Sequence, residues 1–217
     1  MSNIERLAPM SSDTSKNRII TITGLSGSGK DYLVSAAQKI CPDLIGQQIS
    51  IFNFGSELLK SLAAQAPDMP VHNRDMLKQL QQEAIDPAVQ LTLQRLLMNQ
   101  PALYLTHVVH RQRDKLVISP DNERLVNSME YVFVHTEPGQ IFDWRQQEMA
   151  KRQRQQESLD EIAMHQNIAQ AATHALALSL DTGYMIIRNE PSYTAEAASA
   201  LAEESARLCQ NVFRRFV

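Results

Sequence analysis

Three glycines and a lysine occur close together near the start of the chain, where residues 24–30 read GLSGSGK. This run follows a short apolar, β-branched segment, residues 18–23, and precedes a segment with helical spacing of apolar residues. Glycines let the backbone curl so that successive N–H groups point at phosphate oxygens, and the amino terminus of the following helix favours anions. Lys30 adds a mobile cation for the outer phosphates. We therefore expect a nucleoside triphosphate, ATP, to bind at Gly24, Ser26, Gly27, Ser28, Gly29, Lys30, Asp31 and Tyr32.

Asp31 stands where loops of this kind usually carry a Ser or Thr hydroxyl that contacts Mg²⁺. Two unit charges ~4 Å apart repel by about 4 kcal/mol at an effective dielectric near 20, so a bare carboxylate against phosphate is unfavourable. Asp31 must meet the phosphates through a metal ion or water, or turn away and complement the helix amino terminus, which contributes about 0.3–1 kcal/mol. Both interpretations stay open, with ATP and Mg²⁺ as the expected cofactors and Asp31 as the expected metal ligand.

Apolar segments of strand length alternate with helical patterns along the rest of the chain, which predicts a parallel sheet with helices on both faces. Residues 1–17 are expected to form a flexible tail, and residues 18–217 a single three-layer α/β/α domain with a five-stranded parallel sheet. Ser158 and Glu161 match a capping box that opens a long helix. The stretch between the third and fourth strands is expected to be mostly loop with a short helix. Further strands are expected at 48–54, 102–106, 131–136 and 184–187, and helices at 30–40, 137–150 and 194–213.

The composition of the chain argues against several classes of protein, namely those that bind nucleic acid, those that bind or span a membrane and those held together by disulfides. The 217 residues carry 21 basic and 24 acidic side chains, so the net charge of -3 gives no electrostatic case for nucleic acid or an anionic membrane. No apolar run reaches the length of a membrane span. Two cysteines cannot form a disulfide framework, which favours a reducing, cytoplasmic setting.

A cluster of basic residues occurs later in the chain, where Lys151, Arg152 and Arg154 lie in a Gln-rich stretch with no apolar anchor. Arg145 precedes Arg152 by two helical turns, so the two would share a face of a continuing helix. Phosphoryl transfer requires mainly cations and positioning. We interpret residues 145–157 as a small lid and expect Lys30, Arg145 and Arg152 to be catalytic; a solvated charged helix end is the alternative.

Several short motifs follow one another along the chain: the phosphate loop, Asn53-Phe54-Gly55, Arg74-Asp75, Thr106-His107, Arg145, Arg152-Gln153-Arg154 and His165-Gln166. Their order resembles that of one family, the archaeal-type adenylate kinases, over roughly residues 18–190. The resemblance implies a five-stranded P-loop kinase-type sheet with a small lid and ATP-dependent phosphorylation of a nucleoside monophosphate, AMP. It also implies that Arg154 contacts ATP and that Asn53, Gly55, Arg74 and His107 bind the acceptor.

The chain departs from that family at two kinds of position. Leu105 stands where relatives carry the acid that holds Mg²⁺, and the expected lid has Gln146, Glu148 and Gln155 in place of Arg or Asp. The Lys30-Asp31 pair is similar to that of some small-metabolite kinases, such as phosphomevalonate kinase and phage deoxynucleotide kinases. Two alternatives follow: a kinase of another small phosphorylated metabolite, or an ATP-binding regulatory protein with weak or no transfer. His165 lies in an apolar stripe, which favours core packing; the acceptor base and the oligomeric state stay open.

Overall fold

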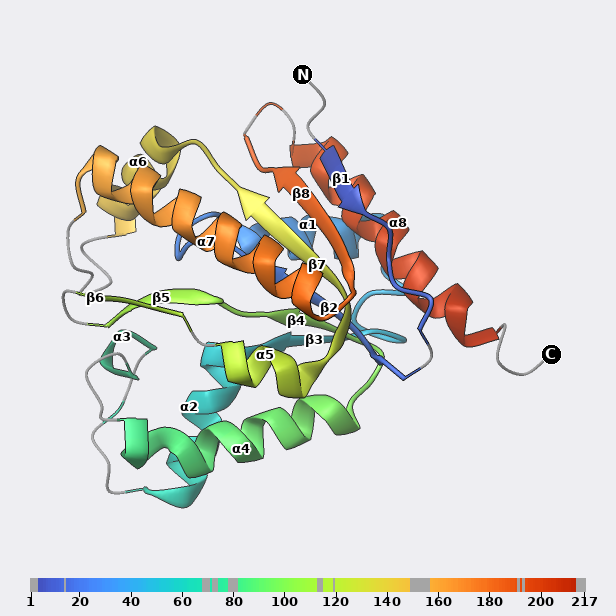
Figure 1. Cartoon of the computed structure of the whole chain (residues 1–217), viewed down its shortest axis with the longest axis horizontal. Coiled ribbons are helices and arrows are strands. Elements are labelled where there is room, and N and C mark those ends of the chain that lie inside the picture. The colour runs from blue at the N-terminus through green and yellow to red at the C-terminus, as the bar shows by residue number, and fades with distance from the viewer. Residues whose placement is uncertain are drawn as a thin grey trace.

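The main sheet of the computed structural model has six strands in the order β1-β8-β7-β2-β4-β3 (Figure 1). The structure describes residues 4–13, 15–67, 71, 74–77, 82–112, 115–118, 120–148, 157–190, 192 and 194–213. The strands of the main sheet are β1 (Ile4–Ala8), β2 (Asn17–Thr23), β3 (Ser50–Asn53), β4 (Ala102–Leu105), β7 (Ser128–His135) and β8 (Gly183–Arg188). The helices are α1 (Lys30–Ile40), α2 (Phe54–Gln65), α3 (Arg74–Leu77), α4 (Gln82–Met98), α5 (Pro120–Val126), α6 (Pro138–Glu148), α7 (Leu159–Ser179) and α8 (Thr194–Phe213).

Five of the six strands run parallel, as the alternation of strands and helices predicts. The two central strands, β2 and β7, are buried along almost their whole length, because helices cover both faces of the sheet. The same parallel order brings the carboxyl ends of these strands to one edge. The loops that follow β2, β4, β7 and β8 therefore meet at that edge, and the candidate site lies there.

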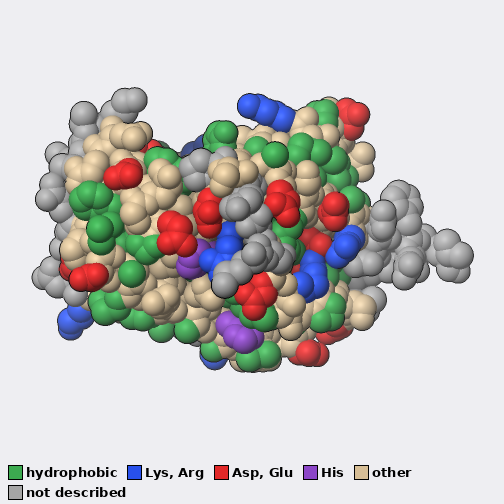
Figure 2. Space-filling view, turned by 90° about the horizontal axis from the view of Figure 1, so that it is seen from above, with side chains coloured by type: hydrophobic (Ala, Val, Ile, Leu, Met, Phe, Trp, Pro, Cys, Tyr) green, Lys and Arg blue, Asp and Glu red, His purple; other side chains and the backbone are tan. Residues whose placement is uncertain are grey.

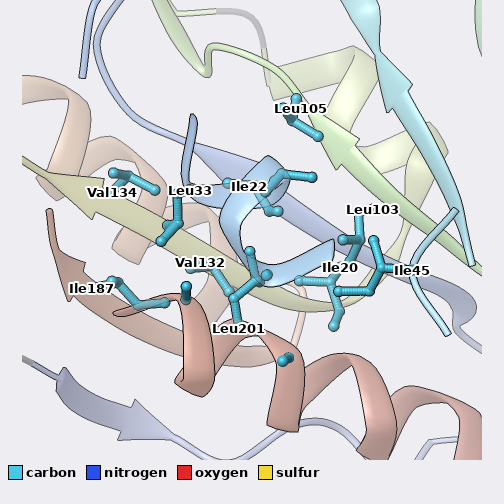
Figure 3. Packing of buried hydrophobic residues seen from close by; sticks show 14 of the residues in the cluster. Ile20, Ile22, Leu33, Ile45, Leu103, Leu105, Val132, Val134, Ile187 and Leu201 are labelled. Carbon is cyan, nitrogen blue, oxygen red and sulfur yellow. The ribbon is translucent and has the colours of Figure 1, made fainter. Parts of the chain in front are cut away.

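Helices cover both faces of the sheet, which confirms the three-layer architecture (Figure 1). Because side chains alternate along a strand, Ile20 and Ile22 face α1 and α8 while Ile19 faces the opposite layer. Figure 3 shows this first apolar cluster, in which Leu33 of α1 and Leu201 of α8 pack on the strands. On the other face, α7 packs on β7 and β8, while α2 and α4 pack on the side of β3 and β4.

The amino-terminal segment contributes a sixth strand, so the expectation of a flexible tail is wrong for residues 4–8. β1 pairs antiparallel with β8, with Ile4 opposite Ile187. Arg6 of this strand contacts two buried carboxylates, Glu130 of β7 at 2.7 Å and Glu204 of α8 at 2.5 Å. The sequence does not reveal this role, because the segment has only five residues and its partners lie more than a hundred residues away in the sequence.

The stretch between β4 and β7 also differs from expectation. It contains an antiparallel pair, β5 (Val109–Gln112) and β6 (Lys115–Ile118), where the sequence predicts mostly loop; the short helix is present as α5. The pair escapes a pattern search because each strand has only four residues and includes charged side chains. Val109 nevertheless packs in the cluster beneath α7. Among the described helices, none has the length and apolar content that crossing a membrane requires.

Candidate active site

The phosphate loop lies between the end of β2 and the start of α1, as the sequence predicts. Gly24 and Gly29 have φ angles of +146° and +77°, in the region that favours glycine. A Cβ on Gly24 would lie 2.6 Å from the carbonyl oxygen of Val134, and one on Gly29 would lie 2.4 Å from Nδ2 of Asn189. Both positions therefore favour glycine for conformation, and Gly24 also requires it for space because the nearest atom there belongs to the backbone.

The Lys30 ammonium lies over this loop. Its Nζ donates to the carbonyl oxygens of Gly24 at 3.0 Å and Leu25 at 2.8 Å, and the side chain is only 8% exposed. His107, which follows β4, contacts the same Gly24 carbonyl oxygen through Nδ1 at 2.7 Å. Because a carbonyl oxygen only accepts hydrogen bonds, Nδ1 of His107 carries the proton. His107, expected to bind the acceptor, is thus placed against the phosphate loop.

Two residues outside the predicted set, Thr136 and Asn189, support the loop from the ends of β7 and β8. The carbonyl oxygen of Ser28 accepts from Oγ1 of Thr136, after β7, and from Nδ2 of Asn189, after β8, each at 2.9 Å. Gln166 of α7 in turn bonds both the N–H and the carbonyl oxygen of Thr136. In the sequence, only their position could have indicated the role of Thr136 and Asn189, because each polar residue directly follows a buried parallel strand.

Arg145 of α6 contacts the loop backbone instead of projecting into open space. Its Nε and Nη2 donate to the carbonyl oxygen of Ser26 at 3.0 and 2.7 Å, and its Nη1 contacts Oε2 of Glu157 at 2.6 Å. The other Glu157 oxygen contacts Nδ1 of His165 at 3.3 Å and Nη1 of Arg111 at 3.2 Å. Burial by itself would raise the pKa of Glu157, but His165 and Arg145 lower it to about 2.

The contact of His165 refines the expectation that this residue only packs in the core. The side chain is buried, yet it also contacts Glu157, the carboxylate that Arg145 and Arg111 share.

On the face drawn in Figure 2, Lys and Arg side chains lie next to Asp and Glu side chains, so that opposite charges adjoin. The expected lid residues Lys151, Arg152 and Arg154 lie outside the described residues.

The predicted metal ligand, Asp31, lies at the exposed start of α1 and is held in place. Its Oδ1 accepts a hydrogen bond from Nδ2 of Asn53 at 2.7 Å. Asn53 is also the N-cap of α2, where its Oδ1 accepts from the N–H of Ser56 at 3.3 Å. Two predicted site residues from different elements are thus brought together, and the second Asp31 oxygen is the one available to a cation.

The positions of the remaining predicted residues add little to the description of the site. Gly55 belongs to the first turn of α2 and not to a turn after the strand. The Tyr32 side chain is 64% exposed. Arg74 opens α3, but its side chain lies outside the described residues. Leu105 is 4% exposed and packs in the apolar cluster of Figure 3, so the end of β4 presents no acid at this position.

The residues present fit ATP better than they fit a tightly enclosed metal. Triphosphate binding uses a glycine-containing loop with an exposed backbone, a lysine that lies across the loop and the amino terminus of a helix. All three are present here. Ser28 Oγ is buried with no hydrogen-bond partner among the described residues. The described residues contain no cluster of three or more His, Cys, Asp or Glu side chains that could enclose a metal. Mg²⁺ needs only one or two carboxylates when it is shared with phosphates, and Asp31 can supply one.

Comparison with known proteins matched no family model and no curated protein. Among solved structures, shikimate kinase from Acinetobacter baumannii, in complex with shikimate, matches with a TM-score of 0.50 at 9% identity, over 89% of this chain and 94% of that chain. Shikimate kinase from Bacteroides thetaiotaomicron matches at 0.45, with 14% identity over 85% and 96% of the two chains. A gluconokinase from Sinorhizobium meliloti 1021 matches at 0.44, with 12% identity over 90% and 95%. The chain therefore has the α/β fold of the Acinetobacter shikimate kinase, with a mostly parallel central sheet and flanking helices.

Proposed function

We propose that this chain is a kinase that transfers the γ-phosphoryl group of ATP to a small molecule. The observation that carries the proposal is the position of Lys30, whose ammonium lies across a loop whose backbone conformation favours glycine at Gly24 and Gly29. Such a loop binds phosphate through its backbone N–H groups, and the lysine ammonium neutralises negative charge that develops on the transferring group. The fold shared with the Acinetobacter shikimate kinase supports the same reaction class.

We further propose that the acceptor is a nucleoside monophosphate, AMP. A hydroxyl acceptor gains from a general base that takes its proton, whereas a phosphate acceptor is already an anion and needs mainly cations. The end of β4 carries Leu105, which offers no carboxylate base, and the Lys30 ammonium, whose Nζ lies 3.4 Å from Nδ1 of His107, is a cation that suits an anion. The resemblance of the motif order to archaeal-type adenylate kinases supports the same acceptor.

In the proposed reaction, a phosphate oxygen of AMP attacks the γ-phosphorus of ATP in line. A new P–O bond forms while the bond to the β-phosphate oxygen breaks, and ADP leaves with that electron pair, so that ATP and AMP give two ADP. Lys30 neutralises charge on the transferring group, and Arg145 holds the loop that positions it. Arg152 and Arg154 remain predicted contributors from the lid. Mg²⁺, when bound, neutralises charge on the phosphates, and Asp31 is the carboxylate that would hold it.

A second candidate is a kinase of another small metabolite, and Asp31 is the observation that favours it, because its carboxylate is held by Asn53, which is predicted to bind the acceptor. The test measures ADP formed from ATP with AMP, other nucleoside monophosphates, shikimate or gluconate as acceptors. We expect ADP formation with AMP, and its loss in Lys30→Ala. Turnover only with a non-nucleotide acceptor would establish the second candidate. Lys30-dependent ATP binding without transfer to any acceptor would favour the regulatory alternative.

A further inference from the structure

Two arginines from different elements converge on one buried carboxylate beside the phosphate loop. Glu157 contacts Arg145 of α6 at 2.6 Å through Oε2, and Arg111 of β5 at 3.2 Å through Oε1. The Glu157 side chain is only 8% exposed. The single negative charge of Glu157 can neutralise the charge of only one of these two guanidinium groups. The other carboxylate near Arg111 among the described residues is Glu161, which is 43% exposed and 3.5 Å away, so that solvent screens this pair.

The two guanidinium groups are held very differently. Arg145 directs three of its nitrogen atoms at defined acceptors, the Ser26 carbonyl oxygen and Glu157, all within 3.0 Å. Among the described residues, Arg111 makes the two longer ion pairs, and its side chain is 21% exposed against 12% for Arg145. Short, aligned contacts are the strong ones in such pairs. Arg145 is therefore fixed to the loop, and Arg111 is the guanidinium whose contacts a phosphate can replace.

Arg111 also lies on an element that begins at the loop. His107, four residues earlier in the chain, donates to the carbonyl oxygen of Gly24, and Val109 between them is buried beneath α7. The start of the β5–β6 pair is thus anchored at the phosphate loop. Arg111, Glu157, Arg145 and Ser26 form one continuous chain of contacts that ends at the loop backbone.

We propose that Arg111 is a phosphate-binding residue of this site and that Glu157 positions it while no nucleotide is bound. The proposal rests on the proposed function and adds to it a cation that the motif pattern does not predict. On binding, the guanidinium exchanges its long contacts with Glu157 and Glu161 for two phosphate oxygens, an arrangement that suits the planar fork of arginine. Glu157 keeps its short contact with Arg145, so that the loop stays in place.

The test compares Arg111→Gln, Arg111→Lys and a control, Arg95→Gln, in binding ATP and inorganic tripolyphosphate. Arg95 lies on α4 near Gln100, which contacts Asn17 at the start of β2, the opposite end of that strand from the phosphate loop. The chain has a single tryptophan, Trp144, whose ring lies 3.4 Å from the place that a Cβ on Gly29 would take, so its fluorescence reports binding. Calorimetry gives an independent dissociation constant.

We expect Arg111→Gln to weaken binding of both ligands about tenfold or more, with a smaller loss at high salt. Arg111→Lys keeps the charge without the fork and should fall between Arg111→Gln and the wild type. Affinities equal to those of Arg95→Gln, together with a lower melting temperature, would overturn the proposal and make Arg111 a structural ion pair. Wild-type protein that binds neither ligand, or binds both equally well after Lys30→Ala, would overturn the proposed function as well.

Discussion

Arg145 donates two hydrogen bonds to the carbonyl oxygen of Ser26, at 3.0 Å from Nε and 2.7 Å from Nη2. A side chain from α6 thus holds the backbone of the phosphate loop at its third residue. The sequence predicts Arg145 to be a catalytic cation that acts on phosphate through its charge. The contact gives it a different role in this state, since a loop held in shape keeps its N–H groups directed at the phosphates before ATP arrives.

A pair of substitutions separates the two roles of Arg145. Arg145→Ala should lower kcat/KM by on the order of 10²-fold, because small displacements of positioning groups are costly in phosphoryl transfer. Arg145→Lys retains the charge but cannot make both hydrogen bonds to Ser26, so we expect it to stay close to the Ala variant. Steady-state kinetics with ATP measures both. Recovery of most of the wild-type rate in Arg145→Lys would return Arg145 to a purely electrostatic role.

Asp31→Ala should raise the Mg²⁺ concentration required for half-maximal activity, because it removes the one carboxylate held at the start of α1. Asp43→Ala, which changes an exposed acid on the loop after α1, is the matched control. A Mg²⁺ titration at fixed ATP gives the comparison. If the two variants titrate alike, Asp31 only complements the helix amino terminus. Moving an acid to Leu105 is a poor complementary test, since it would bury a carboxylate in an apolar cluster.

The free energy of unfolding should fall as the pH rises because of the buried carboxyl group of Glu123 on α5. Burial raises the pKa of its carboxyl to about 8, from an ordinary value of 4.5. Between these values the folded chain keeps a proton that the unfolded chain releases, so the free energy of unfolding falls with pH, by at most about 1.4 kcal/mol per unit. Glu123→Gln removes this proton from both states. Urea unfolding from pH 5 to 8 should show wild type losing stability relative to Glu123→Gln.

The exposed substitution Glu203→Gln on α8 controls for general charge effects in that experiment, and its pH profile should follow that of the wild type. Parallel profiles for wild type and Glu123→Gln would show that the Glu123 carboxyl has the same pKa in the folded and unfolded chain.

Arg6→Ala tests whether the amino-terminal strand belongs to the fold. Removing Arg6 takes the cation from the buried Glu130, whereas Glu204 keeps its contact with Arg207 at 2.8 Å. Removal of one partner of a buried ion pair costs up to about 3–5 kcal/mol. We therefore expect a clear fall in the melting temperature measured by circular dichroism. Glu5→Ala, which changes an exposed neighbour on the same strand, should leave it nearly unchanged. Equal melting temperatures in the two variants would mean that the ion pairs of Arg6 contribute no stability.

Several parts of this protein are determined by short stretches of sequence. The phosphate loop and the helix after it depend on glycines, a lysine and apolar spacing within about twenty residues, and both lie where predicted. The capping box of Ser158 and Glu161 forms at the start of α7, and α8 has the expected bounds. Local conformational preferences and the helical period are sufficient for such elements, because the residues that decide them are neighbours in the chain.

Only the tertiary structure decides which of those elements meet. β1 becomes a strand because β8, far along the chain, offers it a partner edge, and no pattern within its five residues indicates this. Asn189 and Thr136 reach the Ser28 carbonyl oxygen because β7 pairs with β2 and β8 pairs with β7, so that the ends of these strands lie close together. Arg111 and Arg145 share Glu157 for a similar reason, since α7 packs against both of their elements. Hydrogen bonds and ion pairs act over a few ångströms of space, whatever the separation in sequence, so these contacts follow from strand order and packing.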